Sequence, residues 1–310
     1  MKVVISGGTG FIGRALVHAL IGRGDDAVVL TRGEARSIAH RCGECGAGAK
    51  VQLVSWTPEE PGDWQKTIDG ADAVVHLAGA NIGDARWTPE RMELIRSSRV
   101  RSGELIAQAI AAAEKKPRVY VSASATGYYG TSTGSEILTE ESPNGDDFLA
   151  RVCHEWEASA DAARAAGVRV RHPRFGIVLG ASSGILAKMV PMFKAYVGGP
   201  IGDGEQYVPW IHVRDLVSGV LAMIDRDDLD GAYNLTAPDP VTMNELADTL
   251  GEVLHRPAAM RVPGFAVKLA LGHELGDVVL SGQRAIPKRL VDGGFAFVFP
   301  ELASALADLV

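Results

Sequence analysis

The stretch KVVISGGTGFIGRALVHALIGRG, residues 2–24, decides the fold. Its first five residues form an apolar run that ends at glycines, which is typical of a strand buried on both faces of a parallel sheet. After these glycines, Ile12, Leu16 and Leu20 recur every four positions, so we expect an amphipathic helix. AVVLT, residues 27–31, then indicates a second strand. A strand, a glycine-rich turn, a helix and a strand in this order predict the start of a doubly wound α/β domain.

The glycines of the turn have the spacing of a dinucleotide-binding motif, Gly8-x-Gly10-x-x-Gly13. Such glycines allow a tight turn, a close approach of the backbone to a pyrophosphate, and close packing of the helix on the strand. The free N–H groups at the start of the helix can hold phosphates. A glycine-rich turn without a ligand is the alternative interpretation. We predict that the cofactor is bound by Gly7, Gly8, Thr9, Gly10, Phe11, Ile12 and Gly13.

The second strand ends in Thr31 and Arg32, where the NAD form of this motif carries an acidic residue for the ribose 2′-hydroxyl. A guanidinium can hold a 2′-phosphate that a carboxylate would repel. We therefore predict that Thr31 and Arg32 belong to the cofactor site and that the cofactor is NADP rather than NAD. The alternative is that Arg32 is a solvated loop residue.

The alternation of strands and helices continues beyond the first unit. The longest helical stretch is near residues 89–113, and its arginine and glutamate side chains are expected to be exposed. In a doubly wound sheet, ligands bind at the carboxyl ends of the strands. HLAG, residues 76–79, and SASATGYYG, residues 122–130, lie at such ends, so Leu77, Ala78 and Gly79 are expected to contact the cofactor. Further strands are expected at residues 51–56, 72–79, 118–124 and 168–180.

The pattern changes after residue 180, where a loop rich in glycine and proline is followed by a strand and several short helices. We expect a smaller C-terminal α/β lobe that closes over the cofactor domain. The predicted division is a dinucleotide-binding domain of residues 1–180, with contributions from 208–236, and a substrate lobe of residues 181–207 and 237–310.

Composition narrows the classes of partner. The formal charge of -7 argues against nucleic acid as the main partner, because phosphate binding depends on Lys and Arg. No apolar run approaches the length of a membrane span, and the apolar residues before the first glycines are too few for a secretory signal. We therefore expect a cytoplasmic protein with a small-molecule substrate and no membrane partner, and we leave a homodimer open.

Cys42 and Cys45 form a C-x-x-C pair, which is one of the patterns of zinc and redox sites. No second pair of ligands follows at metal spacing, and the surrounding GECGAGAK is typical of a variable surface loop. The loop interpretation is favoured, and no metal site is predicted.

Four motifs together resemble the extended short-chain dehydrogenase/reductase superfamily: ISGGTGFIG, VVHLAGANI, SASATGYYG and PWIHVRDL. SGQRAIPKRLVDGGFAF, residues 281–297, is similar to the C-terminal domain of unknown function found in one of its groups, the sugar nucleotide epimerase-like proteins of the NAD-dependent epimerase/dehydratase family. The resemblance implies a Rossmann-type doubly wound parallel sheet, a nicotinamide dinucleotide cofactor and hydride transfer. It also implies that the His and Asp of PWIHVRDL stabilise the loop between the lobes.

The superfamily's active site has a Ser or Thr after the fifth strand and a Tyr-x-x-x-Lys pair on the next helix. Ser124 falls on the first position, with Thr126 as its nearest rival. Residues 146–160, where the pair should lie, contain neither tyrosine nor lysine, and no tyrosine of the chain is followed by lysine at this spacing. We predict that Ser124 and Tyr128 are catalytic, with Arg151 or His154 as helpers of Tyr128 or Tyr129; both tyrosines being structural is the alternative.

The expected function is that of an NADP-dependent oxidoreductase or epimerase-like enzyme acting on a small carbonyl or hydroxyl compound, with nucleotide sugars among the candidates. Arg284, Lys288 and Arg289, with Gln283, are candidate contacts for an anionic substrate or a solvated helix face. The competing function is a non-catalytic NADP(H)-binding redox sensor or scaffold, because the Tyr-x-x-x-Lys pair is absent.

Overall fold

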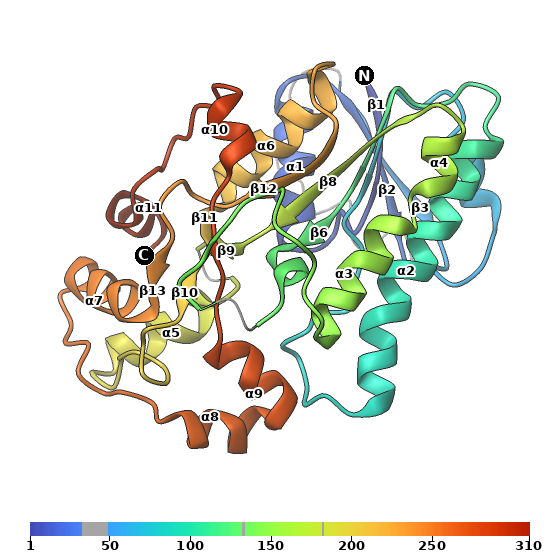
Figure 1. The fold of residues 1–310 in the computed structure, drawn as a ribbon. Helices are drawn as coiled ribbons and strands as arrows, with labels where there is room; N and C mark the ends of the chain where they lie inside the picture. Colours follow the sequence, from blue (N-terminus) through green and yellow to red (C-terminus); the bar gives the residue numbers. More distant parts are fainter. Residues whose placement is uncertain (33–48, 132–133, 182) are drawn as a thin grey trace.

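The central sheet is parallel and runs in the order β12-β8-β5-β4-β1-β2-β3, with β6 also paired to β8 (Figure 1). It belongs to a computed structural model that describes residues 1–32, 49–131, 134–181 and 183–310. The order reverses between β1 and β4, which confirms the doubly wound, Rossmann-type sheet. The strands are β1 (Lys2–Ser6), β2 (Asp26–Thr31), β3 (Val51–Ser55), β4 (Ala73–His76), β5 (Val119–Ser122), β6 (Ser124–Ala125), β8 (Arg169–Phe175) and β12 (Gly231–Leu235).

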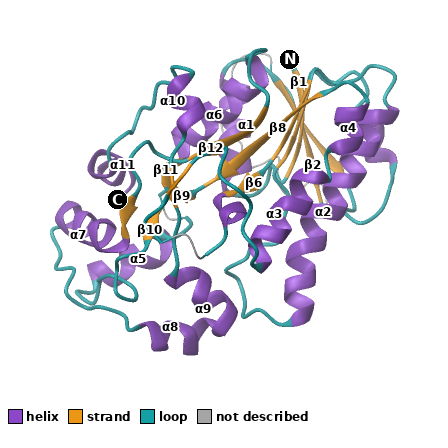
Figure 2. Ribbon diagram, viewed as in Figure 1, coloured by secondary structure: helices purple, strands orange, loops and turns teal. Residues whose placement is uncertain are grey.

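Helices cover both faces of the sheet, as Figure 2 shows. On one face, α1 (Phe11–Gly22) and α6 (Val213–Asp225) bury Leu16 and Val220 against β1. On the other, α2 (Pro89–Ala112) and α4 (Asp161–Ala165) bury Ile106 and Ala163, and α3 (Phe148–Ala158) packs beside α2. Because β1 is buried from both sides, its continuous apolar run has no polar alternation.

Most of the remaining elements form a second layer of short strands and helices, whereas α10 (Lys288–Asp292) packs on β12 and buries Leu290 in the core beside α1 and α6. The core of the second layer joins Phe193, Leu246 and Leu306 of three helices. The boundaries predicted between the two lobes stay a prediction. The strand pairs are β9 (Ile177–Leu179) with β11 (Trp210–His212), β10 (Tyr207–Val208) with β13 (Val241–Thr242), and β7 (Ile137–Leu138) with β14 (Arg284–Ala285). The other helices are α5 (Leu186–Lys194), α7 (Met243–Leu254), α8 (Gly264–Leu271), α9 (His273–Leu280) and α11 (Leu302–Leu309).

The single strand expected at 168–180 is divided in two at Gly176. A Cβ at Gly176 would lie 1.9 Å from the carbonyl oxygen of Pro209, so only glycine lets the two backbones approach this closely. The neighbouring Ile177 donates its N–H to that carbonyl at 2.8 Å. Beyond the division, the chain leaves the main sheet as β9 and pairs with β11. The carboxyl end of β8 therefore opens toward the second layer.

Two further expectations from the sequence concern the C-x-x-C pair and helices that could cross a membrane. Cys42 and Cys45, the C-x-x-C pair, lie outside the described residues. Among the helices that are described, none combines the length and the apolar character that a bilayer crossing requires.

The contact between α1 and the turn after β1 gives a stability prediction. A Cβ at Gly13 would lie 2.2 Å from the Gly7 carbonyl oxygen, whereas a Cβ at Gly22, on the same helix, would meet nothing within 4 Å. We expect Gly13→Ala to lower the free energy of unfolding by about 1–3 kcal/mol through overpacking. Gly22→Ala is the matched control and should be neutral or stabilising by up to ~1 kcal/mol, since alanine favours helix. Urea denaturation of both variants checks this, and equal midpoints would contradict it.

Candidate cofactor cavity and substrate cleft

A cavity of about 410 Å³ lies at the carboxyl ends of β1, β2 and β4. Most of the predicted cofactor residues line it: Gly7, Thr9, Gly10, Thr31, Arg32, Leu77, Ala78 and Gly79. The other four pack behind it. A Cβ at Gly8 would touch Val29, the Phe11 ring lies against Gly180, Ile12 packs on the core, and Gly13 lies against Gly7.

The geometry of this cavity fits a dinucleotide. Gly7 has φ +74°, and a Cβ there would lie 2.7 Å from the Leu77 carbonyl carbon, so the turn lies directly against the end of β4. Gly10 precedes α1, and no side chain caps the N-terminus of that helix. The first N–H groups of α1 are thus available to phosphate oxygens. At the end of β2, Thr31 is buried and Arg32 is exposed, which is where a ribose 2′-substituent is read in this fold.

A second cavity, the cleft, has a volume of about 460 Å³ and shares Gly79, Ala80 and Asn81 with the first. It lies between the sheet and the second layer. Its walls are mainly apolar, from α3, β9, β10, α7 and α9. Its polar side chains are Asn81, Arg99, Thr126, Cys153, Gln206, Tyr207, Ser281 and Gln283.

SASATGYYG reaches the cleft through Ala125, Thr126 and Gly127. Thr126–Tyr129, which follow the strand expected at 118–124, form a short 3₁₀ helix. Ser124 is buried in β6, and its Oγ has no hydrogen-bond partner among the described residues. Neither Ser124 nor Tyr128 lines the cleft, and their catalytic roles stay predictions.

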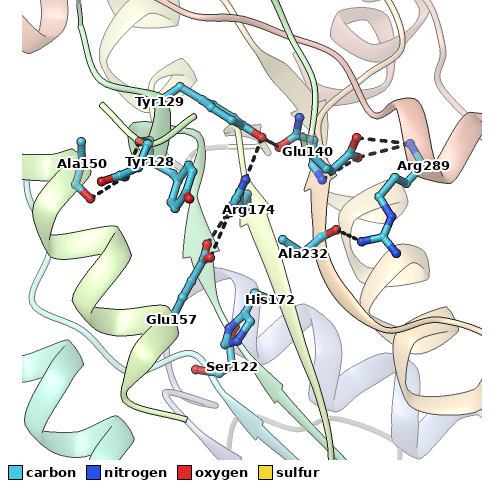
Figure 3. Close-up of polar contacts among 12 residues, drawn as sticks. Ser122, Tyr128, Tyr129, Glu140, Ala150, Glu157, His172, Arg174, Ala232 and Arg289 are labelled. Carbon is cyan, nitrogen blue, oxygen red and sulfur yellow. Dashed lines mark hydrogen bonds and ion pairs between the residues drawn. The ribbon is translucent and has the colours of Figure 1, made fainter. Parts of the chain in front are cut away.

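Both tyrosines pack against Arg174, at the end of β8 (Figure 3). The Tyr128 ring centroid lies 3.4 Å from the guanidinium carbon. Arg174 donates from Nε and Nη2 to the two carboxylate oxygens of Glu157, at 2.8 and 2.9 Å, and from Nη1 to the Tyr129 hydroxyl at 3.1 Å. That hydroxyl donates to Oδ1 of Asn234 at 2.7 Å. Burial raises the pKa of Tyr129 to about 12, so this phenol stays protonated at neutral pH and can donate its hydrogen bond to Asn234.

The same network continues to the C-terminal segment. Asn234 donates its side-chain amide to the carbonyl of Ile286 at 2.9 Å, and Glu140 accepts the backbone N–H groups of Asn234 and Arg289. Burial raises the pKa of the Glu140 carboxyl. The Arg289 guanidinium donates to the backbone carbonyls of Ala232, in β12, and of Asp230 (Figure 3 shows the first of these contacts). Lys288 pairs with Asp292.

Of the candidate contacts for an anionic substrate, only Gln283 lines the cleft. Arg284 lies over the Tyr207 ring, with 4.9 Å between the guanidinium carbon and the ring centroid. Lys288 and Arg289 make the contacts described above and stay outside the cleft. The basic residues of this segment therefore stabilise the fold around the cleft rather than line it.

Helix α3 presents Leu149, Val152, Cys153 and Trp156 to the cleft. The two pairs at the spacing of Tyr-x-x-x-Lys are thus Leu149 with Cys153, and Val152 with Trp156. Burial raises the pKa of the Cys153 thiol to about 12, so it stays protonated. Arg151 and His154, the helpers proposed from the sequence, are exposed and do not line the cleft.

Among the polar residues of the cleft, Thr126 and Gln283 are named in the sequence analysis and the other six are missed, of which Arg99, Gln206 and Tyr207 bear most on function. Arg99 lies on α2, whose arginines we expected to be exposed; it is partly buried and faces the cleft. Gln206 and Tyr207 come from the loop rich in glycine and proline, where no periodic pattern indicates which side chains point inward. The sequence offered one signal for Arg99: it follows Ile95 by four residues, so this cation lies on the apolar side of α2.

His212 and Asp215 tie α6 to the C-terminal segment. Asp215 accepts the backbone N–H groups of Val298 and Phe299 at 2.7 and 2.9 Å, and the His212 ring stacks on Phe299 with centroids 4.0 Å apart. Neither lines the cleft.

Comparison with known proteins identifies two matched regions. The model of the NAD dependent epimerase/dehydratase family matches residues 3–236. The model of a domain of unknown function, DUF1731, matches residues 262–309. The boundary between the matches falls before α8.

The whole chain also resembles individual proteins. It is 41% identical to the chloroplastic epimerase family protein SDR39U1 homolog of Arabidopsis thaliana, covering 100% of this chain and 87% of that protein. It is 37% identical to epimerase family protein ML0860 of Mycobacterium leprae, covering 98% and 94%. Human epimerase family protein SDR39U1, solved with NADPH, superposes with a TM-score of 0.84 at 32% identity, covering 100% and 99%. MoeE5, at 19% identity and a TM-score of 0.78, supports the fold alone.

The pair of Arg174 and Glu157 gives a second stability prediction. Glu157→Gln leaves a buried guanidinium without its carboxylate, and we expect a loss of about 3–5 kcal/mol in the free energy of unfolding. Glu155→Gln, on the same helix, breaks the more exposed pair with Arg96 and should cost less than ~1 kcal/mol. Chemical denaturation of both variants measures the difference. Equal losses would show that the Arg174 network contributes no special stability.

Proposed function

The chain belongs to the NAD dependent epimerase/dehydratase family, and we propose that it is an NADP(H)-dependent oxidoreductase or epimerase-like enzyme that acts on a small carbonyl or hydroxyl compound. When bound, the cofactor supplies hydride transfer. A homodimer and a cytoplasmic location stay predictions.

One observation carries the proposal: the cofactor cavity and the cleft meet at Gly79, Ala80 and Asn81. A dinucleotide whose phosphates lie at the start of α1 can extend past these residues into the cleft. Its reactive end would then lie among apolar side chains that exclude water, beside the few polar groups of the cleft. Exclusion of water and a small set of placed polar groups are what a hydride-transfer site requires.

The preference for NADP rests on Arg32 and on a relative. Arg32 lines the cavity at the end of β2 and presents a cation where NAD-binding members of this fold place a carboxylate. The human relative SDR39U1 was solved with NADPH. Both observations support a 2′-phosphate contact made by Arg32 and Thr31.

The proposed polarising group for the substrate oxygen is a hydroxyl of SASATGYYG. Ser124 is the candidate that the resemblance gives, Tyr128 is the replacement that we propose for the absent tyrosine, and Thr126 is the residue of this segment with a hydroxyl that lines the cleft. Tyr207, from β10, is a further phenol in the cleft that can donate a proton. The Cys153 thiol, held protonated, can donate only a weak hydrogen bond.

A redox sensor or scaffold is the second candidate, favoured by α3. This helix lines the cleft with Leu149, Val152, Cys153 and Trp156. These four side chains supply neither the acid/base group nor the positive charge of the usual Tyr-x-x-x-Lys pair. A sensor binds NADP(H) but does not turn over carbonyl compounds. Both candidate functions therefore predict that the protein binds NADP(H), but only the enzyme predicts turnover of a carbonyl compound.

Arg32→Ala tests the cofactor assignment. Removing the cation should weaken NADPH binding by about 10–100-fold, since charge-assisted hydrogen bonds contribute roughly 1.5–3 kcal/mol, and should leave NADH binding nearly unchanged. Arg214→Ala removes an equally charged, exposed side chain on α6 and should change neither affinity. Fluorescence titration of both cofactors provides the measurement. An unchanged preference in Arg32→Ala would remove Arg32 from the 2′-phosphate site.

Turnover of a panel of aldehydes and ketones with NADPH tests catalysis. We expect Thr126→Val to lower kcat/KM by about 10²-fold with NADPH affinity unchanged, because one hydrogen-bond donor to the developing oxyanion is lost. Ser124→Ala and Tyr128→Phe, measured beside it, test the two residues that the sequence analysis predicts to be catalytic. A loss confined to Ser124→Ala or Tyr128→Phe would return the role to that residue. NADPH binding without turnover of any carbonyl compound would support the sensor.

A further inference from the structure

Arg99 is the only charged side chain that lines the cleft, among the residues that the structure describes. It projects from α2 against the backbone of Gly79, where a Cβ would lie 3.0 Å from the guanidinium carbon. It therefore lies at the junction of the cofactor cavity and the cleft. The glycine at position 79 leaves room for this arginine.

The guanidinium of Arg99 has few partners. Nη1 donates to the Ile95 carbonyl at 2.9 Å, and the guanidinium carbon lies 5.3 Å from the centroid of the Trp156 ring. No carboxylate forms an ion pair with it in the described ranges, and burial lowers its pKa. A guanidinium has five N–H donors, so most of its hydrogen-bonding capacity is available to a ligand. A partly buried cation without a counter-ion is costly to the fold unless a ligand supplies the negative charge.

The remainder of the cleft limits what that ligand can be. Its walls are mainly apolar, with Phe175, Met243 and Leu275 among them. Gln206 adds an acceptor, because its buried Oε1 has no hydrogen-bond partner among the described residues. A nucleoside diphosphate carries at least two negative charges, whereas one cation, Arg99, lines the cleft among the residues described. A carboxylate matches one guanidinium in both charge and bidentate geometry.

From this charge count and these walls, we propose that the cleft binds a mainly apolar substrate with a single carboxylate, and that Arg99 holds the carboxylate. The proposal rests on the function proposed above, since it names the substrate class of the same site. The apolar part of the substrate packs on the α3 and α9 walls, and its carboxylate lies beside Gly79. Arg99 thereby acts as a specificity-determining residue.

The cofactor's pyrophosphate is another source of negative charge at this junction, so the experiment separates the two. Isothermal titration of the full chain, with and without NADP⁺, uses a series of straight-chain and phenyl-substituted carboxylates, their primary amides, and UDP-glucose. In the wild-type protein we expect the carboxylates to bind about tenfold or more tightly than the amides of the same shape, and UDP-glucose not to compete. If no carboxylate binds better than its amide, or if UDP-glucose binds in their place, the proposal is wrong.

Arg99→Met keeps an unbranched stem close in length to the aliphatic part of arginine and removes the charged guanidinium. It should weaken carboxylate binding about tenfold or more and leave the affinities for the amides and for NADP⁺ within about twofold; Arg99→Lys should restore part of the carboxylate affinity. Because no described carboxylate pairs with Arg99, the melting temperature of Arg99→Met should not fall. A loss of NADP⁺ affinity in Arg99→Met equal to that in Arg32→Ala would assign the guanidinium to the cofactor and overturn the proposal.

Failure of the proposed function has a different signature. If the wild-type protein does not bind NADP⁺ or NADPH, the cofactor assignment fails, whatever the carboxylates do. If NADP⁺ binds and the carboxylates do not, only the substrate class is wrong.

Discussion

The bidentate ion pair between Arg174 and Glu157 holds together the elements that build the cleft. It joins the end of β8 to α3, and through Tyr129 and Asn234 it reaches β12 and the C-terminal segment. Desolvation makes such a pair favourable only when the remaining donors are also satisfied. Here Nη1 donates to Tyr129, and both aromatic rings lie against the guanidinium. Without this network, SASATGYYG would lose the contacts that place Thr126 beside the cleft.

Two partly or fully buried arginines contact α3: Arg174 pairs with Glu157, and Arg99 lies over the Trp156 ring. Arg174 has a carboxylate partner, and the pKa of its guanidinium is raised by that partner despite burial. Arg99 has no such partner in the part of the chain that the structure describes, and burial lowers its pKa. The first cation therefore stabilises the fold, whereas the second is held in a state that a ligand's negative charge would improve. Unsatisfied groups of this kind are expected at functional sites, where stability is exchanged for binding.

The sequence predicted the sheet well because its signals are local. Apolar runs ending in glycine predicted β1 and β4. The spacing of Gly8, Gly10 and Gly13 predicted the turn beside which the cofactor cavity lies. The division at Gly176 depends on the Pro209 carbonyl, a contact that no local pattern reveals. The cleft was predicted least well, because its polar groups come from segments far apart in the sequence. Local pattern treated Arg99 as one more charge on an exposed helix face.

The same helix that carries Glu157 also explains how the cleft differs from the superfamily's usual active site. The resemblance places a tyrosine and a lysine on this helix, and α3 presents Leu149 and Cys153 at that spacing instead. A protic group and a cation are nevertheless present, from other elements: Thr126 and Tyr207 on one side, and Arg99 of α2 on the other. Moving the cation from α3 to α2 places it beside Gly79, at the junction of the two cavities. A cation at this junction can hold the charged group of a substrate, and in the proposed binding mode it serves substrate recognition rather than acid catalysis.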